Sequence, residues 1–155
     1  MRYALAALAL LAVVAGLWFL RPSLAAPPLA AVHEDGFRIH VRISGADPEL
    51  SSRVYNALSV DVFGYPIVVQ HEPEFSSQHT GWGFGGKASV DGEGSMLPGH
   101  DGAAVRSDVL TYLTPILDRS WERVSVTCDT RDGAGAAVRY ELRMNGETPS
   151  WVAVE

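Results

Sequence analysis

The sequence predicts an α+β fold in which helices cover one face of a small antiparallel sheet. Three short segments alternate apolar with polar residues, which is typical of strands that have one buried face. Two longer segments carry apolar residues at helical spacing, each after an aspartate that suits a helix N-cap. An open sheet with helices on one side matches both patterns, because only one face of each strand is then buried.

The first half of the folded region supplies a strand, a helix and a broken apolar segment. Residues 37–43 alternate throughout and predict a strand. Asp47 followed by Pro48 predicts the start of a short amphipathic helix that ends near Ser59. Residues 60–69 are apolar and β-branched but contain a glycine and a proline, so they predict an edge strand or two short strands.

The second half supplies another helix and a strand meander. We expect a helix after Asp101, with Pro115 inside its apolar stripe, where the helix should kink or restart. Strands are expected at residues 122–128, 138–143 and 151–154. The full order of strand, helix, strand, strand, helix, strand is the split βαβ pattern of ferredoxin-like folds, here with a C-terminal β-meander.

Residues 79–102 hold eight of the 15 glycines in the chain. Trp82 and Phe84 alternate with glycines, and the next two glycines suit a two-residue turn. This pattern predicts a hairpin that places Trp82 opposite Ser89. One face of the hairpin would be nearly free of side chains, so that another part of the protein can approach closely.

Cys128 is the only cysteine, so no intrachain disulfide is possible. In the predicted strand it shares a face with Val124 and Val126. Because unpaired cysteine behaves as a small hydrophobic residue, we expect Cys128 to lie in the core.

The N-terminus predicts a connection to the membrane. The 18 residues from Tyr3 to Leu20 carry no charge, which fits the length of a membrane span. We interpret residues 1–21 as a single-pass anchor or signal segment, 22–35 as a linker rich in proline and alanine, and 36–155 as an extracytoplasmic, periplasmic domain. The alternative is secretion to the periplasm after cleavage near Ala25, since small residues precede it.

The balance of acidic and basic residues limits the kinds of partner that the chain can bind. Without Arg2 and Arg21 of the N-terminal segment, the chain has 10 basic and 18 acidic residues, which excludes non-specific binding of nucleic acid through phosphate contacts. Arginines nevertheless recur at outward strand positions, and their planar fork suits carboxylates and phosphates. The alternative is a solvated face whose arginines pair with Glu141 and with acids in the loops. We predict a basic sheet face and the aromatic hairpin as partner-binding surfaces, with these residues: Arg38, His40, Arg42, Trp82, Phe84, Arg139 and Arg143.

Signals for catalysis, metals and cofactors are weak. Residues 81–88, GWGFGGKA, approach a phosphate-binding loop but end in alanine and precede no helix pattern. His71, His79 and His100 are the weak candidates for metal ligands, and their spacing matches no metal signature. No serine lies in a nucleophile elbow. We therefore predict no catalytic residue, no assigned metal and no cofactor.

These inferences predict a membrane-tethered periplasmic binding or accessory domain that contacts a protein or another anionic partner without catalysis. The first alternative is a metal-dependent hydrolase that uses the region from His71 to His100. The second alternative is a structural envelope subunit that self-associates through its anchor or its last strand.

Overall fold

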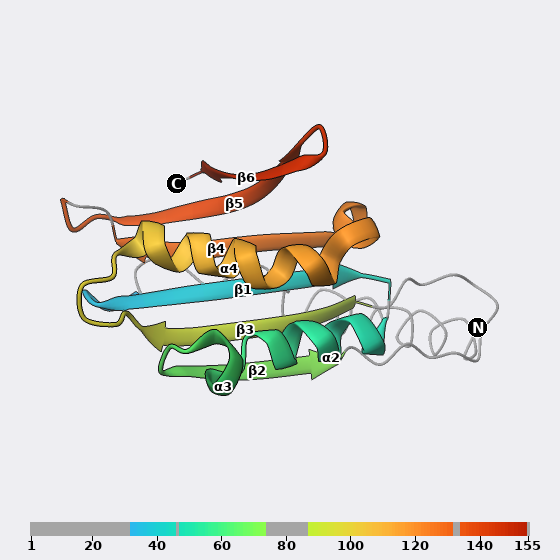
Figure 1. Cartoon of the computed structure of the whole chain (residues 1–155), viewed down its shortest axis with the longest axis horizontal. Helices are drawn as coiled ribbons and strands as arrows, with labels where there is room; N and C mark the ends of the chain where they lie inside the picture. Colours follow the sequence, from blue (N-terminus) through green and yellow to red (C-terminus); the bar gives the residue numbers. More distant parts are fainter. Residues whose placement is uncertain (1–31, 46, 74–86, 132–133, 155) are drawn as a thin grey trace, which may run out of the picture.

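A six-stranded antiparallel sheet organises the chain in the computed structural model (Figure 1), which describes residues 32–45, 47–73, 87–131 and 134–154. The strand order is β2-β3-β1-β4-β5-β6. The strands are β1 (Gly36–Ser44), β2 (Ile67–Pro73), β3 (Lys87–Ser95), β4 (Val124–Arg131), β5 (Ala137–Asn145) and β6 (Thr148–Ala153). The helices are α2 (Pro48–Ala57), α3 (Val60–Phe63), α4 (Gly102–Leu117) and the 3-10 helix η2 (Asp118–Arg123).

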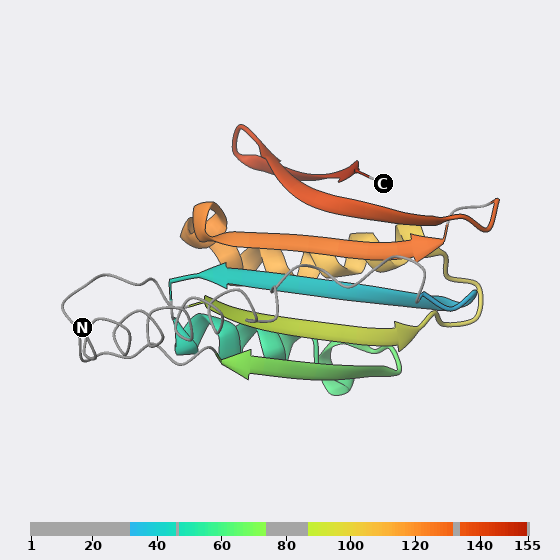
Figure 2. The same ribbon diagram turned by 180° about the vertical axis from the view of Figure 1, so that it is seen from behind.

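The described helices lie on one side of the sheet. Helix α2 follows β1, and α4 connects β3 to β4. Figure 2, seen from behind, shows the strands in front of the helices, so no described helix covers this second side. The α+β class predicted from the sequence is therefore confirmed.

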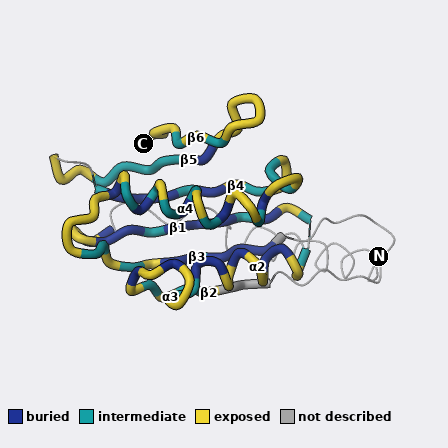
Figure 3. The backbone as a smooth tube through the Cα atoms, in the orientation of Figure 1, coloured by how far each residue is buried: buried dark blue, intermediate teal, exposed yellow. Residues whose placement is uncertain are grey.

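The core lies between the sheet and the two longer helices. Strand β1 supplies four fully or almost fully buried residues, Phe37, Ile39, Val41 and Ile43, which confirms the alternation predicted for this segment. Helix α2 buries Leu50 and Val54 against them, and α4 buries Val105, Val109 and Leu113 (Figure 3). Burial of each such side chain stabilises the fold by about 1.5–3 kcal/mol.

Both long helices begin at the aspartates expected from the sequence. The Asp47 carboxylate accepts a hydrogen bond from the Leu50 amide at 2.9 Å, and Asp101 accepts one from the Ala104 amide at 2.9 Å. The Ala104 hydrogen bond lowers the pKa of Asp101. Helix α4 continues through Pro115 to Leu117 and does not restart.

One predicted strand is partly helical. Residues Val60–Phe63 form α3, and β2 begins only at Ile67. The helix closes at Gly64, whose φ of 79° is easily adopted only by glycine and whose N–H donates to the Val60 carbonyl at 3.0 Å. This local ending overrides the strand preference of the β-branched valines. Strand β2 lies at the edge of the sheet, as its proline-flanked sequence predicted.

Much of the glycine-rich region is the interior strand β3, and the predicted hairpin register is wrong. Ser89 lies opposite Arg42 of β1 on one side and opposite Glu72 of β2 on the other, so Trp82 has no place beside it. Trp82 and Phe84 themselves lie outside the described residues. The strand that pairs with β3 in this hairpin is β2, with the intervening residues undescribed.

Gly92 and Gly94 leave room on the helix-facing side of β3. A Cβ atom on Gly94 would lie 2.7 Å from the Pro66 carbonyl oxygen and 2.8 Å from the Phe37 ring. Phe37 stacks edge-on against Tyr65, with ring centroids 5.4 Å apart. Glycine therefore lets the chain before β2 cross the sheet closely and pack an aromatic cluster on it.

We predict that Gly94→Ala destabilises the protein by about 1–3 kcal/mol, because backbone of the Pro66 and Ile67 segment must shift. Gly92→Ala is the matched control on the same face of β3. Its Cβ would meet the flexible end of the Ile67 side chain at 2.7 Å, so we expect a change within about 1 kcal/mol. Urea unfolding of the two variants measures this difference, and equal effects would contradict the close-approach explanation.

The C-terminal strands confirm the predicted meander. Strands β4, β5 and β6 are sequential antiparallel neighbours, and the last turn passes through Gly146 at a φ of 66°. Cys128 in β4 is completely buried on the helix side beside Val126, as expected. Burial raises the pKa of its thiol from 9.0 to about 12.

The buried thiol predicts a loss of stability at alkaline pH. Because the folded-state pKa is raised, the thiol stabilises the folded state fully below about pH 9, and this contribution is lost as pH rises towards 12. At about pH 10 the wild type should lose about 1.4 kcal/mol relative to Cys128→Ala, whose unfolding lacks this titration. Denaturant unfolding of both proteins across this range checks it, and parallel pH profiles would show that the thiol does not contribute.

Candidate functional site

The side of the sheet opposite the helices, called the open face below, carries rows of polar side chains. Antiparallel register places residues from neighbouring strands directly opposite one another on this face. The face is built from Arg38, His40 and Arg42 of β1, Ser89, Asp91 and Glu93 of β3, Ser125, Thr127 and Asp129 of β4, and Arg139, Glu141 and Arg143 of β5.

Acidic residues accompany most of these arginines. Arg139 forms a bidentate ion pair with Asp129, at 2.7 and 2.8 Å. Arg143 pairs with Glu141 at 2.7 Å, and Arg38 lies 3.7 Å from Glu93. The interpretation of this face as a segregated basic surface is therefore wrong, because acids from three strands alternate with the arginines.

The sequence did not indicate that the acids on β3 lie opposite the charged residues of β1. Asp91 and Glu93 alternate with Val90, Gly92 and Gly94, which is a strand pattern in which glycine occupies apolar positions. The predicted hairpin had a return strand of only Lys87 to Val90, which left Asp91 and Glu93 outside it. Strict alternation from residue 88 to 94 was the signal that could have placed both carboxylates on the open face.

A hollow of about 320 Å³ lies on the open face and is called the β1–β5 hollow below. It brings together four of the predicted partner-binding residues, His40, Arg42, Arg139 and Arg143. Arg38 lies on the same face but does not line the hollow, and its side chain is only 11% exposed. The other lining residues are Ser125, Thr127, Glu141 and Val154.

His40 is held in a defined orientation within this hollow. It is 8% exposed, and its Nδ1 is hydrogen-bonded to the Asp91 carboxylate. A carboxylate accepts hydrogen bonds, so Nδ1 carries the proton and donates a hydrogen bond to Asp91. The opposite ring nitrogen, Nε2, is buried and has no hydrogen-bond partner among the described residues.

Arg42 is the second residue with an unsatisfied group. Its Nε is buried and likewise lacks a partner within the described ranges. Its neighbours across the sheet are Ser89 and Ser125, whereas Arg38 lies opposite Glu93 and Asp129. The sequence thus gives Arg38 acidic neighbours and gives Arg42 neutral ones.

The carboxylate, imidazole and hydroxyl of Asp91, His40 and Thr127 follow one another across three strands. Such a set activates a nucleophile when the hydroxyl is hydrogen-bonded to the imidazole. His40 Nε2 makes no such bond in the described part of the chain. Among the described residues, Thr127 is therefore not hydrogen-bonded to the imidazole as an activated nucleophile would be.

The candidate metal ligands are not assembled by the described residues. The backbone of His71 lies in β2 opposite Val90, and His79 lies outside the described residues. His100 precedes α4, where its ring contacts Tyr65 edge-on with centroids 5.8 Å apart. No group of three or more His, Cys, Asp or Glu that could hold a metal ion occurs within the described ranges.

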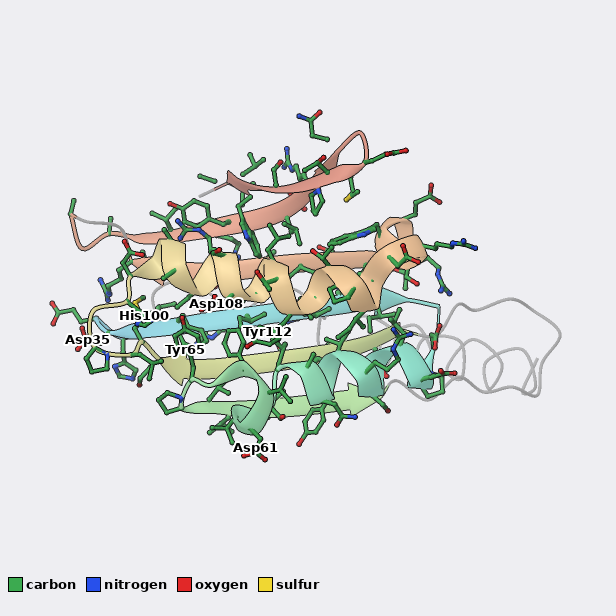
Figure 4. All side chains as sticks on the ribbon, viewed as in Figure 1. Asp35, Asp61, Tyr65, His100, Asp108 and Tyr112 are labelled. Atoms are coloured by element: carbon green, nitrogen blue, oxygen red, sulfur yellow. The ribbon has the colours of Figure 1, made fainter. Side chains whose placement is uncertain are left out.

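A polar cluster on the helix side has a structural role. The Tyr65 hydroxyl donates to the Asp108 carboxylate at 2.7 Å, and Figure 4 shows these residues beside Tyr112 and His100. Burial and the neighbouring Asp108 carboxylate raise the pKa of Tyr65, so the phenol stays protonated. This bond connects the segment before β2 to helix α4.

Searches against protein-family models, curated proteins and solved structures found no match to the chain. None of the helices in the described ranges is long and apolar enough to cross a membrane. The predicted span from Tyr3 to Leu20 lies outside these ranges.

The two ion pairs beside the hollow should differ in their contributions to stability. Asp129 is 3% and Arg139 14% exposed, so Asp129→Ala leaves a buried cation and should destabilise the fold by about 3–5 kcal/mol. Glu141→Ala removes a pair whose side chains are 34% and 56% exposed, and should cost about 0–1 kcal/mol. Thermal and urea unfolding of both variants measure the difference, and comparable losses would contradict a structural role for the Asp129 pair.

Proposed function

We propose that the chain is a membrane-tethered extracytoplasmic binding or accessory domain that contacts an anionic partner protein through its open face. The observation that carries this proposal is the β1–β5 hollow, where His40 and Arg42 present unsatisfied polar groups beside Arg139 and Arg143. Guanidinium groups suit carboxylates because their planar N–H groups match two oxygens.

The uncharged N-terminal segment supports the tether and the periplasmic location. Its 18 residues from Tyr3 to Leu20 have the length of a span, and cleavage near Ala25 would instead release the domain into the periplasm. The strand order supports a ferredoxin-like class for the domain. Strands β4, β1, β3 and β2 are adjacent in that order, with a helix in each of the two long connections, while β5 and β6 extend the sheet.

Net charge favours one orientation for an acidic partner. The chain carries a formal charge of −6, which repels acidic surfaces over most of its exterior. Three arginines line the β1–β5 hollow with one acid, Glu141. An acidic group therefore meets the least repulsion there, and this difference selects the contact surface.

The sheet edge supports self-association as a second candidate function. Strand β6 is an edge strand, and Val152 and Val154 on its open-face side are 38% and 39% exposed. An exposed edge with apolar side chains is a template for strand pairing with a second copy. This candidate requires only the chain itself.

Affinity capture from membranes tests the main proposal. We expect the full chain, extracted from membranes with detergent and cross-linked, to retain a specific acidic protein that mass spectrometry identifies. The double variant Arg42→Glu/Arg143→Glu should reduce capture by about tenfold or more, because like charges would then meet at the hollow. Arg119→Glu, which changes a 97% exposed arginine outside the hollow, is the matched control.

Three outcomes would contradict parts of the proposal. Equal capture by the double variant and the control would remove the hollow as the contact surface. Recovery of the full chain in the soluble fraction would contradict the tether. Cross-linked copies of the chain as the dominant product would favour self-association through β6.

A further inference from the structure

We propose that the β1–β5 hollow binds a carboxylate group, held jointly by the guanidinium of Arg42 and the imidazole of His40. This inference rests on the proposed function and names the chemical group that the partner inserts. The carboxylate would come from an aspartate or glutamate side chain of that protein.

The first support is the unsatisfied hydrogen-bonding capacity of the two residues. Arg42 Nε–H is a buried donor without an acceptor, and His40 Nε2 is buried without any partner, among the residues that the structure describes. Buried polar groups in folded proteins nearly always have partners, so an unpaired group indicates a missing one. A carboxylate oxygen would accept from Arg42 Nε–H, and it would accept from His40 Nε2 when that nitrogen also carries a proton.

The second support is the register around Arg42. Its neighbours on both adjacent strands are serines, Ser89 and Ser125, so no acid faces it across β3 or β4. Arg38, four residues earlier on the same face, lies opposite Glu93 and Asp129. The strand thus keeps one arginine in a structural pair and leaves the next available to a ligand.

The charges of the hollow select a monoanion. Asp129 neutralises Arg139, and Glu141 neutralises Arg143, through pairs of 2.7 Å. Among the lining arginines, Arg42 alone lacks an ion pair with an acidic residue in the described ranges. One positive charge matches a carboxylate, whereas a phosphate dianion needs more positive charge than this site supplies.

The hydrogen bond to Asp91 fixes the orientation of the His40 ring. His40 donates Nδ1–H to Asp91 of β3, so the ring is held with Nε2 on the opposite side. The residues of the β1–β5 hollow around the ring are Thr127 of β4, Arg139, Glu141 and Arg143 of β5, and Arg42 of its own strand. A carboxylate at Nε2 requires a proton on that nitrogen as well.

Nuclear magnetic resonance on the full chain in detergent micelles tests the proposal with small probes. N-acetylglutamate N-methylamide supplies the carboxylate, its glutamine analogue is the neutral control, and inorganic phosphate tests the choice of anion. The side-chain nitrogen signals of Arg42 Nε and His40 Nε2 report binding directly. We expect saturable shifts of both with the glutamate probe, and none with the glutamine probe.

Variants separate a binding role from a structural one. Arg42→Gln should weaken binding of the glutamate probe by about tenfold or more, since a charge-assisted hydrogen bond is lost. His40→Gln should also weaken binding of the glutamate probe, since the imidazole no longer contacts the carboxylate. Arg119→Gln should leave binding unchanged, and a melting curve for each variant establishes that it is folded.

Several results would overturn the inference. These are no saturable shift with the glutamate probe, equal shifts with the glutamine probe, tighter binding of phosphate than of the glutamate probe, or unchanged binding in folded Arg42→Gln. If the probe binds but no protein is captured from membranes, the carboxylate site stands and the proposed function fails. If a partner is captured equally by wild type and Arg42→Gln, the function stands and the carboxylate site fails.

Discussion

The two faces of β1 determine the rest of the structure. Side chains alternate along a strand, so burial of Phe37, Ile39, Val41 and Ile43 beneath the helices directs every intervening residue to the open face. A shift of one residue would bring arginines into the core and expose the apolar row. The hydrophobic core therefore fixes the position of His40 as firmly as it fixes its own members.

Strand β3 complements β1 on both sides through the same alternation. Its glycines on the helix side admit the aromatic cluster around Phe37, while Asp91 and Glu93 on the open face meet His40 and Arg38. Strand β3 thus provides space for packing on its helix side and carboxylates on its open-face side. Gly94 lies where a Cβ would collide with the Pro66 carbonyl oxygen and the Phe37 ring, so close packing requires glycine at that position.

Local patterns predicted much of the fold because they depend on nearest neighbours in the chain. The alternation of residues 37–43, the caps at Asp47 and Asp101, and the burial of Cys128 are all confirmed by the structure. The short helix α3 was missed because a single left-handed glycine, Gly64, outweighs the strand preference of two valines.

The candidate site was predicted only in part, because its properties arise from pairing between strands. The sequence indicated which residues of β1 and β5 face outward, and the hollow gathers four of them. It did not indicate which acids lie opposite them, since register depends on contacts between segments distant in the chain. Trp82 and Phe84, in the other predicted surface, lie outside the described residues.

Arg38 and Arg42 show how strand pairing gives two residues of the same type different electrostatic environments. Both occupy outward positions of β1, and nothing in the local sequence separates them. Across the sheet, Arg38 meets carboxylates that restrain it, and Arg42 meets hydroxyls that carry no charge. Partial burial of a charged side chain is energetically unfavourable, and an ion pair with an opposite charge offsets this cost. The serines beside Arg42 are therefore as important to the site as the arginine itself, because an acid at either position would occupy the guanidinium from within the protein.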